Sequence, residues 1–204
     1  MGQAAIQIAQ SRQAKVLVTV GSPEKRQLLI DRYGIDPGNI FSSREVTFAH
    51  EVIARTRGKG LDVVLNSLSG RALVETWRCM APLGRFLEIG KRDIDAFKQL
   101  PMDPFKHNVS FCSIDIDMVL SHNDKLMQQL MNEVEQLVLS EPSRQLTAPY
   151  PLTVFKRSEF EKALRLIQTG QHIGKVVVDW EDPDTIQVSN TVCGMAHLHG
   201  LCRA

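Results

Sequence analysis

The sequence predicts an α/β fold built on a doubly wound parallel sheet. Apolar runs rich in β-branched residues alternate with amphipathic runs of helical spacing, which is the pattern of a parallel sheet covered by helices on both faces. Proline, glycine and small polar residues stand between these runs, where helices usually begin and end. The 204 residues are enough for one domain, or for one domain and part of a second.

The first half of the chain alternates helices and strands. Its strands are short β-branched runs such as KVLVTV and LDVVLN. In order, the sequence predicts a helix over 3–12, a strand over 15–20, a helix from Pro23 to Gly34, a strand at 40–41, a helix capped by Thr47 that ends at Gly58, a strand over 61–66, a helix capped by Ser69 that ends near Met80, and strands over 85–89 and 109–114.

The second half changes in pattern. A long amphipathic helix is expected over 123–139, where apolar residues recur at helical spacing. A proline-containing linker over 141–151 follows. The predicted elements after it are a strand over 152–155, a helix with Phe160, Ala163, Leu164 and Ile167 on one face, and a strand over 175–180. Residues 181–204 show no periodicity and are expected to form a loose tail.

Composition excludes several classes of protein. The chain is 43% hydrophobic and 23% charged, as in an ordinary globular domain. A net charge of +1 argues against nucleic acid or an anionic membrane as the main partner. No apolar run is long enough to span a bilayer, and no signal peptide is recognisable, so a cytoplasmic location is expected. Four scattered cysteines do not suggest a disulfide framework.

One glycine, Gly2, stands where a phosphate-binding loop would lead into the first helix. In a Rossmann-type fold a glycine-rich loop lets backbone N–H groups approach a dinucleotide pyrophosphate at a helix N-terminus. A single glycine before a helix is common, so the signal alone is weak. Met1 falls where that loop would already be under way, and no strand precedes it in this sequence.

The end of the second strand suggests which dinucleotide would bind. An NAD-binding fold usually has an acidic residue there for the ribose 2′-hydroxyl, but Val20 is followed by GSPEKR. A hydroxyl and two cations, at Ser22, Lys25 and Arg26, would suit the 2′-phosphate of NADP. The alternative is that Lys25 and Arg26 are solvated residues of a first helical turn.

Polar residues also follow several later strands. Asn66 and Ser67 follow LDVVLN, Lys91 follows RFLEIG, and Asp115 and Asp117 follow the next strand. Ligands of open α/β sheets bind beyond the carboxyl ends of the strands, and a lysine and an aspartate meeting there could deliver a proton. Spacing alone leaves open a plainer interpretation, in which Lys91 is a surface residue and one aspartate caps a helix.

A metal site is not predicted. The tail contains Cys193, His197, His199 and Cys202, but their spacing differs from the paired ligands of zinc sites.

Taken together, these residues resemble the enoyl reductase domain of highly reducing polyketide synthases and animal-type fatty acid synthases, a zinc-free branch of the medium-chain dehydrogenase/reductase family. LDVVLNSL together with GRFLEIGK is the most specific part of the match, and the remaining segments follow in the family's order. The matching segments are GQAAIQIAQ (2–10), TVGSPEKRQLL (19–29), GKGLDVVLNSLSG (58–70), CMAPLGRFLEIGKRD (79–93), KHNVSFCSIDID (106–117) and GQHIGKVVV (170–178).

The resemblance implies an NADPH-dependent reduction of an α,β-unsaturated acyl thioester carried on an acyl carrier protein, within a multidomain synthase. Hydride would go to the β-carbon, and the enolate would then be protonated at the α-carbon. The implied proton donors are Lys91 and Asp117. The implied cofactor residues are Gly2, Ser22, Lys25, Arg26, Asn66, Ser67, Leu68, Ile89, Gly90, Gly174 and Lys175.

The resemblance also implies parts that this sequence lacks: a substrate-binding subdomain, the first strand of the sheet and the earlier loop glycines. That strand would lie between those at 15–20 and 61–66, so two apolar strand edges would have no partner. We expect an N-terminally truncated Rossmann domain over 1–114, the returning segment of a GroES-like substrate-binding subdomain over 115–180, and a tail over 181–204.

Two other functions stay open at this point. The chain could be a non-catalytic remnant or scaffold that binds cofactor poorly, or a zinc-free quinone oxidoreductase of the same family. EIGK followed by Asp117 favours the synthase type. A homodimer is a further alternative that the sequence does not test.

Overall fold

The computed structural model describes residues 1–139, 146–170 and 172–181. These residues fall into two compact units that divide between Thr147 and Ala148. We describe each unit by itself. The boundary expected at residue 114 assigns segments to family subdomains and stays a prediction. Most of the expected tail, from residue 182 onward, lies outside the described residues.

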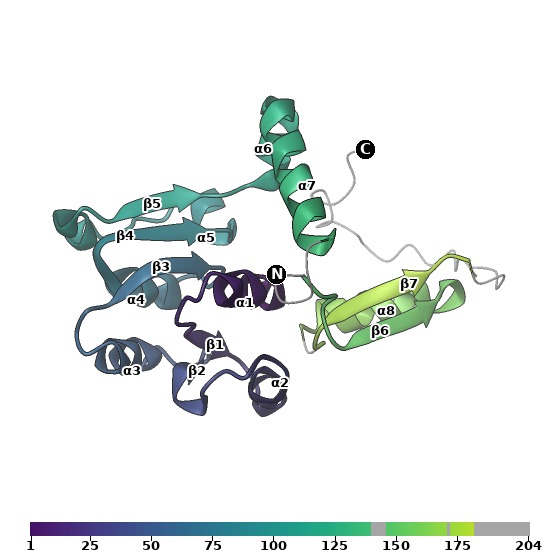
Figure 1. Cartoon of the computed structure of the whole chain (residues 1–204), viewed down its shortest axis with the longest axis horizontal. Helices are drawn as coiled ribbons and strands as arrows, with labels where there is room; N and C mark the ends of the chain where they lie inside the picture. Colours follow the sequence, from purple (N-terminus) through teal and green to yellow (C-terminus); the bar gives the residue numbers. More distant parts are fainter. Residues whose placement is uncertain (140–145, 171, 182–204) are drawn as a thin grey trace. The chain divides into compact units, whose positions relative to one another are not determined.

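Unit 1 contains most of the regular structure (Figure 1). Its longer elements are α1 (Gly2–Ser11), β1 (Val18–Val20), α2 (Pro23–Tyr33), β2 (Ile40–Ser42), α3 (Phe48–Arg55), β3 (Leu61–Asn66), α4 (Arg71–Arg78), β4 (Met80–Glu88), β5 (Ser110–Ser113), α6 (Ile116–His122) and α7 (Asp124–Leu139). Its short helical turns are η1 (Pro37–Asn39), α5 (Arg92–Asp95) and η2 (Asp103–His107).

The strands of unit 1 form two separate parallel sheets. β1 pairs with β2, and β3, β4 and β5 pair in that order. The prediction of an α/β fold with parallel strands is therefore confirmed. Within the described residues, β1 and β3 each have a neighbour on one side only. One face of β3 also carries half-exposed apolar side chains, Val63 at 49% and Leu65 at 45% exposure.

Helix α4 covers the opposite face of β3. Trp77 of this helix is fully buried, and its ring lies edge-on to Phe86 of β4 with the centroids 5.4 Å apart. Val64 of β3 and Val109 complete this core beside Leu73. Burying several large apolar side chains at one contact supplies the main driving force for holding a helix on a sheet. This contact fixes the elements that carry the candidate site.

Helices α1, α2 and α3 organise the smaller sheet. Ile6 of α1 and Leu29 of α2 pack with Ile40 of β2. Phe48 of α3 packs with Phe41 of β2 and with Cys79, which precedes β4. Helix α3 therefore contacts elements of both sheets, even though the two sheets share no strand pairing.

Unit 2 is a small parallel pair with a crossover helix. It consists of β6 (Leu152–Lys156), η3 (Arg157–Glu159), α8 (Phe160–Gln168) and β7 (Lys175–Asp179). β6 and β7 pair in parallel from Leu152–Lys175 to Lys156–Asp179. Gly174 precedes β7 with a positive φ of 75°, and a side chain there would collide with the Pro151 carbonyl oxygen.

Several predicted boundaries differ from the structure. The strand expected over 15–20 is regular only from Val18, and the strand expected from residue 85 begins at Met80. Ser69 does not cap α4, because the N-cap position is Gly70. Thr47 does occupy the N-cap of α3, but its hydroxyl makes no capping bond. Helix α6 corresponds to the helix that one of the two aspartates was expected to cap in the plainer interpretation, but its bounds were not predicted, since its seven residues are too few to show periodicity.

None of the helices in the described ranges is long and apolar enough to cross a membrane.

Candidate active site

The carboxyl ends of β3, β4 and β5 form one edge of the larger sheet. Asn66, Glu88 and Ser113 are the last residues of these strands, and they are partners in the parallel register. The loops that leave this edge contain Ser67 and Leu68 after β3, and the glycine and lysine of EIGK after β4. The register therefore brings residues from three separate sequence segments together.

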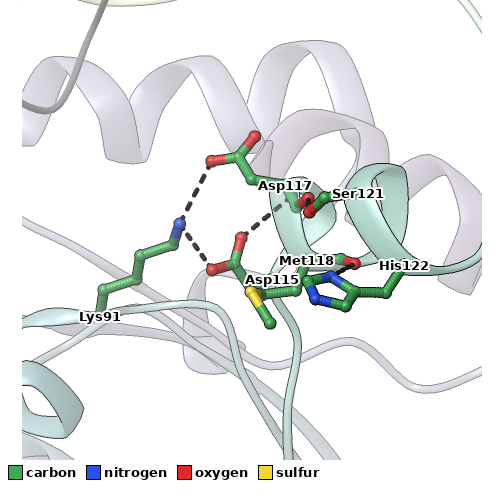
Figure 2. Close-up of polar contacts among 6 residues, drawn as sticks. All are labelled: Lys91, Asp115, Asp117, Met118, Ser121 and His122. Carbon is green, nitrogen blue, oxygen red and sulfur yellow. Dashed lines mark hydrogen bonds and ion pairs between the residues drawn. The ribbon is translucent and has the colours of Figure 1, made fainter. Parts of the chain in front are cut away.

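Lys91 meets two carboxylates from the loop and helix that follow β5 (Figure 2). Its Nζ lies 2.8 Å from Oδ2 of Asp115 and 3.3 Å from Oδ2 of Asp117. The side chain of Asp115 is 27% exposed, while that of Asp117 is 81% exposed. Asp115 is thus the closer and better-shielded partner of Lys91.

Asp115 has a second contact as well. It is the N-cap of α6, and its Oδ1 accepts a hydrogen bond from the Asp117 backbone N–H at 3.0 Å. Capping and lysine pairing are therefore properties of the same carboxylate, although they looked like alternatives in the sequence. The other polar side chains in Figure 2, Ser121 and His122, bond back to carbonyls of α6 and do not contact Lys91.

The two charges stabilise each other's ionised form. The hydrogen bond that Lys91 donates to Asp115 is the main cause that raises the pKa of Lys91, with Asp117 adding to it. The same hydrogen bond is the main cause that lowers the pKa of Asp115. Lys91 therefore stays protonated through neutral pH and above, and keeps a proton held at a fixed place.

Asn66 and Glu88 lie beneath this edge and are buried, at 3% and 1% exposure. Asn66 Nδ2 donates to Glu88 Oε2 at 2.5 Å and to the Leu68 carbonyl at 2.8 Å. The Gly90 N–H donates to Glu88 Oε1 at 2.6 Å. Both side-chain N–H bonds of Asn66 are thus used inside the protein, while Ser67 is exposed and Leu68 and Ile89 are half-buried.

The loop at the carboxyl end of β1 leads into α2, and Ser22 and Arg26 there have structural contacts of their own. Ser22 caps α2 by accepting a hydrogen bond from the Lys25 N–H at 3.3 Å. The Arg26 guanidinium donates to the carbonyls of Ile40 at 2.5 Å and Pro37 at 2.6 Å. Arg26 therefore ties α2 to β2, whether or not it also contacts a cofactor.

Arg44 is a cation at the same edge that the sequence did not single out. It follows β2, and its Nε lies 3.9 Å from the position that a Cβ on Gly21 would take. Hydrogen bonding by Ser22 is the main cause that lowers the pKa of Glu24, and the charge of Arg44 adds to the effect. Arg44 lies more than twenty residues after Gly21 in the sequence, so their proximity becomes visible only through the pairing of β1 with β2.

The remaining predicted cofactor residues are Gly2, Gly174 and Lys175. Gly2 begins α1, and no atom lies within 4 Å of the Cβ it lacks. Gly174 and Lys175 belong to unit 2, so their part in the site stays a prediction. The structure explains why residue 174 is a glycine, because its backbone closely approaches that of Pro151 and leaves no room for a side chain.

No cluster of metal-ligating side chains occurs within the described ranges. Cys193, His197, His199 and Cys202 lie outside them.

A family of zinc-binding dehydrogenases matches residues 1–136 of the chain. The chain is 44% identical over 188 residues to the highly reducing polyketide synthase azaB of Aspergillus niger and 42% identical over 188 residues to the lovastatin diketide synthase lovF of Aspergillus terreus. Each match covers 92% of this chain but only 7% of the synthase. The chain therefore spans a small part of these relatives.

Solved structures agree with these matches. The CurK enoyl reductase is 36% identical with a TM-score of 0.72, over 87% of this chain and 51% of its own. The nucleotide-binding subdomain of the enoylreductase domain of PpsC from Mycobacterium tuberculosis is 38% identical with a TM-score of 0.62. That match covers 67% of this chain and 75% of the subdomain.

Replacement of Arg26 by alanine should destabilise the fold, because the carbonyls of Ile40 and Pro37 would lose a charged donor. Hydrogen bonds to charged groups contribute about 1.5–3 kcal/mol each, so we expect the free energy of unfolding to fall by about 2 kcal/mol. Lys25→Ala is the matched control and should change it by less than about 0.5 kcal/mol. Urea unfolding of both variants measures the difference; equal midpoints would contradict a structural role for Arg26.

Proposed function

Because the chain belongs to the medium-chain dehydrogenase/reductase family, and within it to the enoyl reductase domains of highly reducing polyketide synthases, we propose that it forms the cofactor-binding part of an NADPH-dependent enoyl reductase. The proposed substrate is an α,β-unsaturated acyl thioester on an acyl carrier protein. The observation that carries the proposal is the contact of Lys91 with two aspartates at the sheet edge.

The residues at the end of β1 fit NADPH better than NADH. No acidic residue ends this strand to bind a ribose 2′-hydroxyl. Ser22, Lys25 and Arg44 supply a hydroxyl and two cations there, and these groups match the charge of a 2′-phosphate. Asn66, Ser67 and Leu68 would lie at the nicotinamide side of the cofactor, since they stand at the end of β3, next to the end of β4 that leads to Lys91.

NADPH, when bound, supplies the hydride that reduces the β-carbon of the enoyl thioester. Lys91 then donates a proton from Nζ to the α-carbon of the resulting enolate. Asp115 orients the ammonium group of Lys91 and keeps it protonated. Asp117 is the more exposed partner of Nζ, so it can carry a proton between Lys91 and solvent.

The open edges of β1 and β3 favour a second proposal: the 204 residues alone bind NADPH weakly. The sheet order 3-2-1-4-5-6 of this fold class places a strand between these two edges, and its loop would hold the pyrophosphate.

An extended chain should therefore bind NADPH more tightly than residues 1–204. The extension joins the remaining half of a related enoyl reductase, such as CurK, ahead of Met1 and thereby adds the strand and the glycine loop. Each backbone N–H that reaches a phosphate contributes about 1.5–3 kcal/mol, so the dissociation constant should fall by about tenfold or more. Titration by NADPH fluorescence compares the two chains; equal affinities would contradict the proposal.

In the extended enzyme, Lys91→Ala should lower enoyl turnover by roughly 10²-fold, the lower part of the range for general acids. Lys91→Ala together with Asp117→Ala should cost at least as much. Lys59→Ala is the control, since Lys59 is exposed and pairs only with Asp62 within the described residues. Steady-state oxidation of NADPH with an enoyl thioester measures the rates. Turnover that survives both replacements would remove Lys91 and Asp117 from proton transfer.

Asp115→Asn should lower the pKa of Lys91, because it removes the hydrogen bond that does most to raise it. The protonated form of Lys91 would then be lost at lower pH than in the unmodified chain. Asp117→Asn should move the titration in the same direction but less. The chemical shift of the Lys91 ε-carbon, followed by NMR against pH, measures this. A midpoint unmoved by Asp115→Asn would show that this carboxylate does not control the lysine.

A further inference from the structure

Glu88 has an environment unlike that of its neighbours along the same face of the sheet. Val64 and Phe86, paired with each other two residues earlier in the register, are buried apolar residues beneath α4. Glu88 continues that face and is more buried than Val64, yet it is a carboxylic acid. Within the part of the chain that the structure describes, no lysine or arginine contacts it.

Burial of this acid is unfavourable for the fold itself. Desolvation is the main cause that raises the pKa of Glu88, and the hydrogen bonds from Asn66 and Gly90 only partly offset it. An apolar side chain at such a position is usually as stable or more stable than an uncompensated buried charge. Glu88 is therefore not explained by packing, and costly polar residues of this kind concentrate at functional sites.

The hydrogen bonds of Glu88 join two turns. Oε2 accepts from the side chain of Asn66, which also bonds the Leu68 carbonyl and so orders the turn after β3. Oε1 accepts from the Gly90 N–H, one residue before Lys91. A carboxylate is required because both partners are donors. A glutamine would present its own N–H₂ to one of them, whichever way it turned.

We propose that Glu88 is a positioning residue, whose buried carboxylate holds the backbone before Lys91 at a fixed place relative to the Asn66–Leu68 turn. The proposal rests on the function proposed above, because those two segments are the proton donor and the nicotinamide side of the site. Glu88 itself touches neither substrate nor cofactor.

A second carboxylate ties the same two loops further along. Asp93, two residues after Lys91, accepts a hydrogen bond from the Gly70 N–H at the start of α4. Its side chain is nearly buried and also pairs with Lys98 at 3.2 Å. Lys91 therefore stands between two acidic ties to the loop after β3. This arrangement restricts the backbone on both sides of the lysine.

The first experiment tests the hydrogen bond between Glu88 and the Gly90 N–H in the 204-residue chain. Glu88→Met removes both acceptor oxygens at similar side-chain length, so it should raise the hydrogen-exchange rate of the Gly90 amide by roughly tenfold or more. The amide of Phe86, inside β4, serves as the internal reference. Glu51→Met, at an exposed position on α3, is the matched control. An unchanged Gly90 amide would overturn the proposal.

The second experiment tests the link to Lys91 in the extended enzyme. Glu88→Gln should lower kcat by roughly 10- to 100-fold, as expected for a small displacement of a reacting group, with the KM for NADPH changed much less. Combined with Lys91→Ala, it should add little further loss, because both changes remove the same positioned proton. Losses that multiply in the double variant would overturn the positioning role.

The two experiments separate failure of this proposal from failure of the proposed function. If Lys91→Ala alone leaves turnover intact, the proton-donor role of Lys91 is wrong. Hydrogen exchange of the Gly90 amide still tests the contact between Glu88 and Gly90 in that case. If Glu88→Met does not fold, Glu88→Gln with Asn66→Asp restores a donor–acceptor pair of reversed direction. Protection of the Gly90 amide should then return, and its failure to return in a folded double variant would overturn the tie.

Discussion

The parallel pairing of β3, β4 and β5 is the constraint on which the candidate site depends. Parallel strands end at the same edge, so the segments after Asn66, Glu88 and Ser113 meet there despite separations of more than twenty residues along the chain. Burial of Trp77 against Phe86 holds α4 over the sheet and keeps that edge in place. Lys91 then meets Asp115 and Asp117 as a consequence of register rather than of any local motif.

Much of this arrangement could be predicted from the sequence, and the exceptions have physical reasons. Runs rich in β-branched residues located β3, β6 and β7, because strand propensity and apolar pattern agree there. A meeting of Lys91 with an aspartate after β5 was one of two interpretations of the spacing, and the resemblance singled out Asp117, whereas the shorter contact in the structure is with Asp115. Which of two aspartates approaches a lysine depends on the path of the α6 turn. Similarly, nothing local to Arg26 shows that its guanidinium binds two distant carbonyls.

Asp115 and Glu88 have different roles at this edge of the sheet. Asp115 is partly exposed, paired with a cation and held in its ionised form, so it acts on the charge of Lys91. Glu88 is buried and lacks a cationic partner within the described residues, so it acts on backbone positions through neutral donors. The separation is physically sensible, because a buried ion pair is costly to desolvate, whereas an exposed one holds geometry poorly.

In the part of the chain that the structure describes, β1 and β3 each have one edge without a strand partner. The strand order of this fold class would place one further strand between these edges, and we call that position the seam. A strand inserted there would gain two ladders of hydrogen bonds while losing the conformational entropy of only one segment. Insertion of such a strand is strongly favoured when it pairs with both edges, and much less favoured when it pairs with only one. The seam is therefore a suitable place to divide the domain for split-protein reconstitution. Two separately made pieces would restore the sheet when they associate, and the return of cofactor binding would report that association.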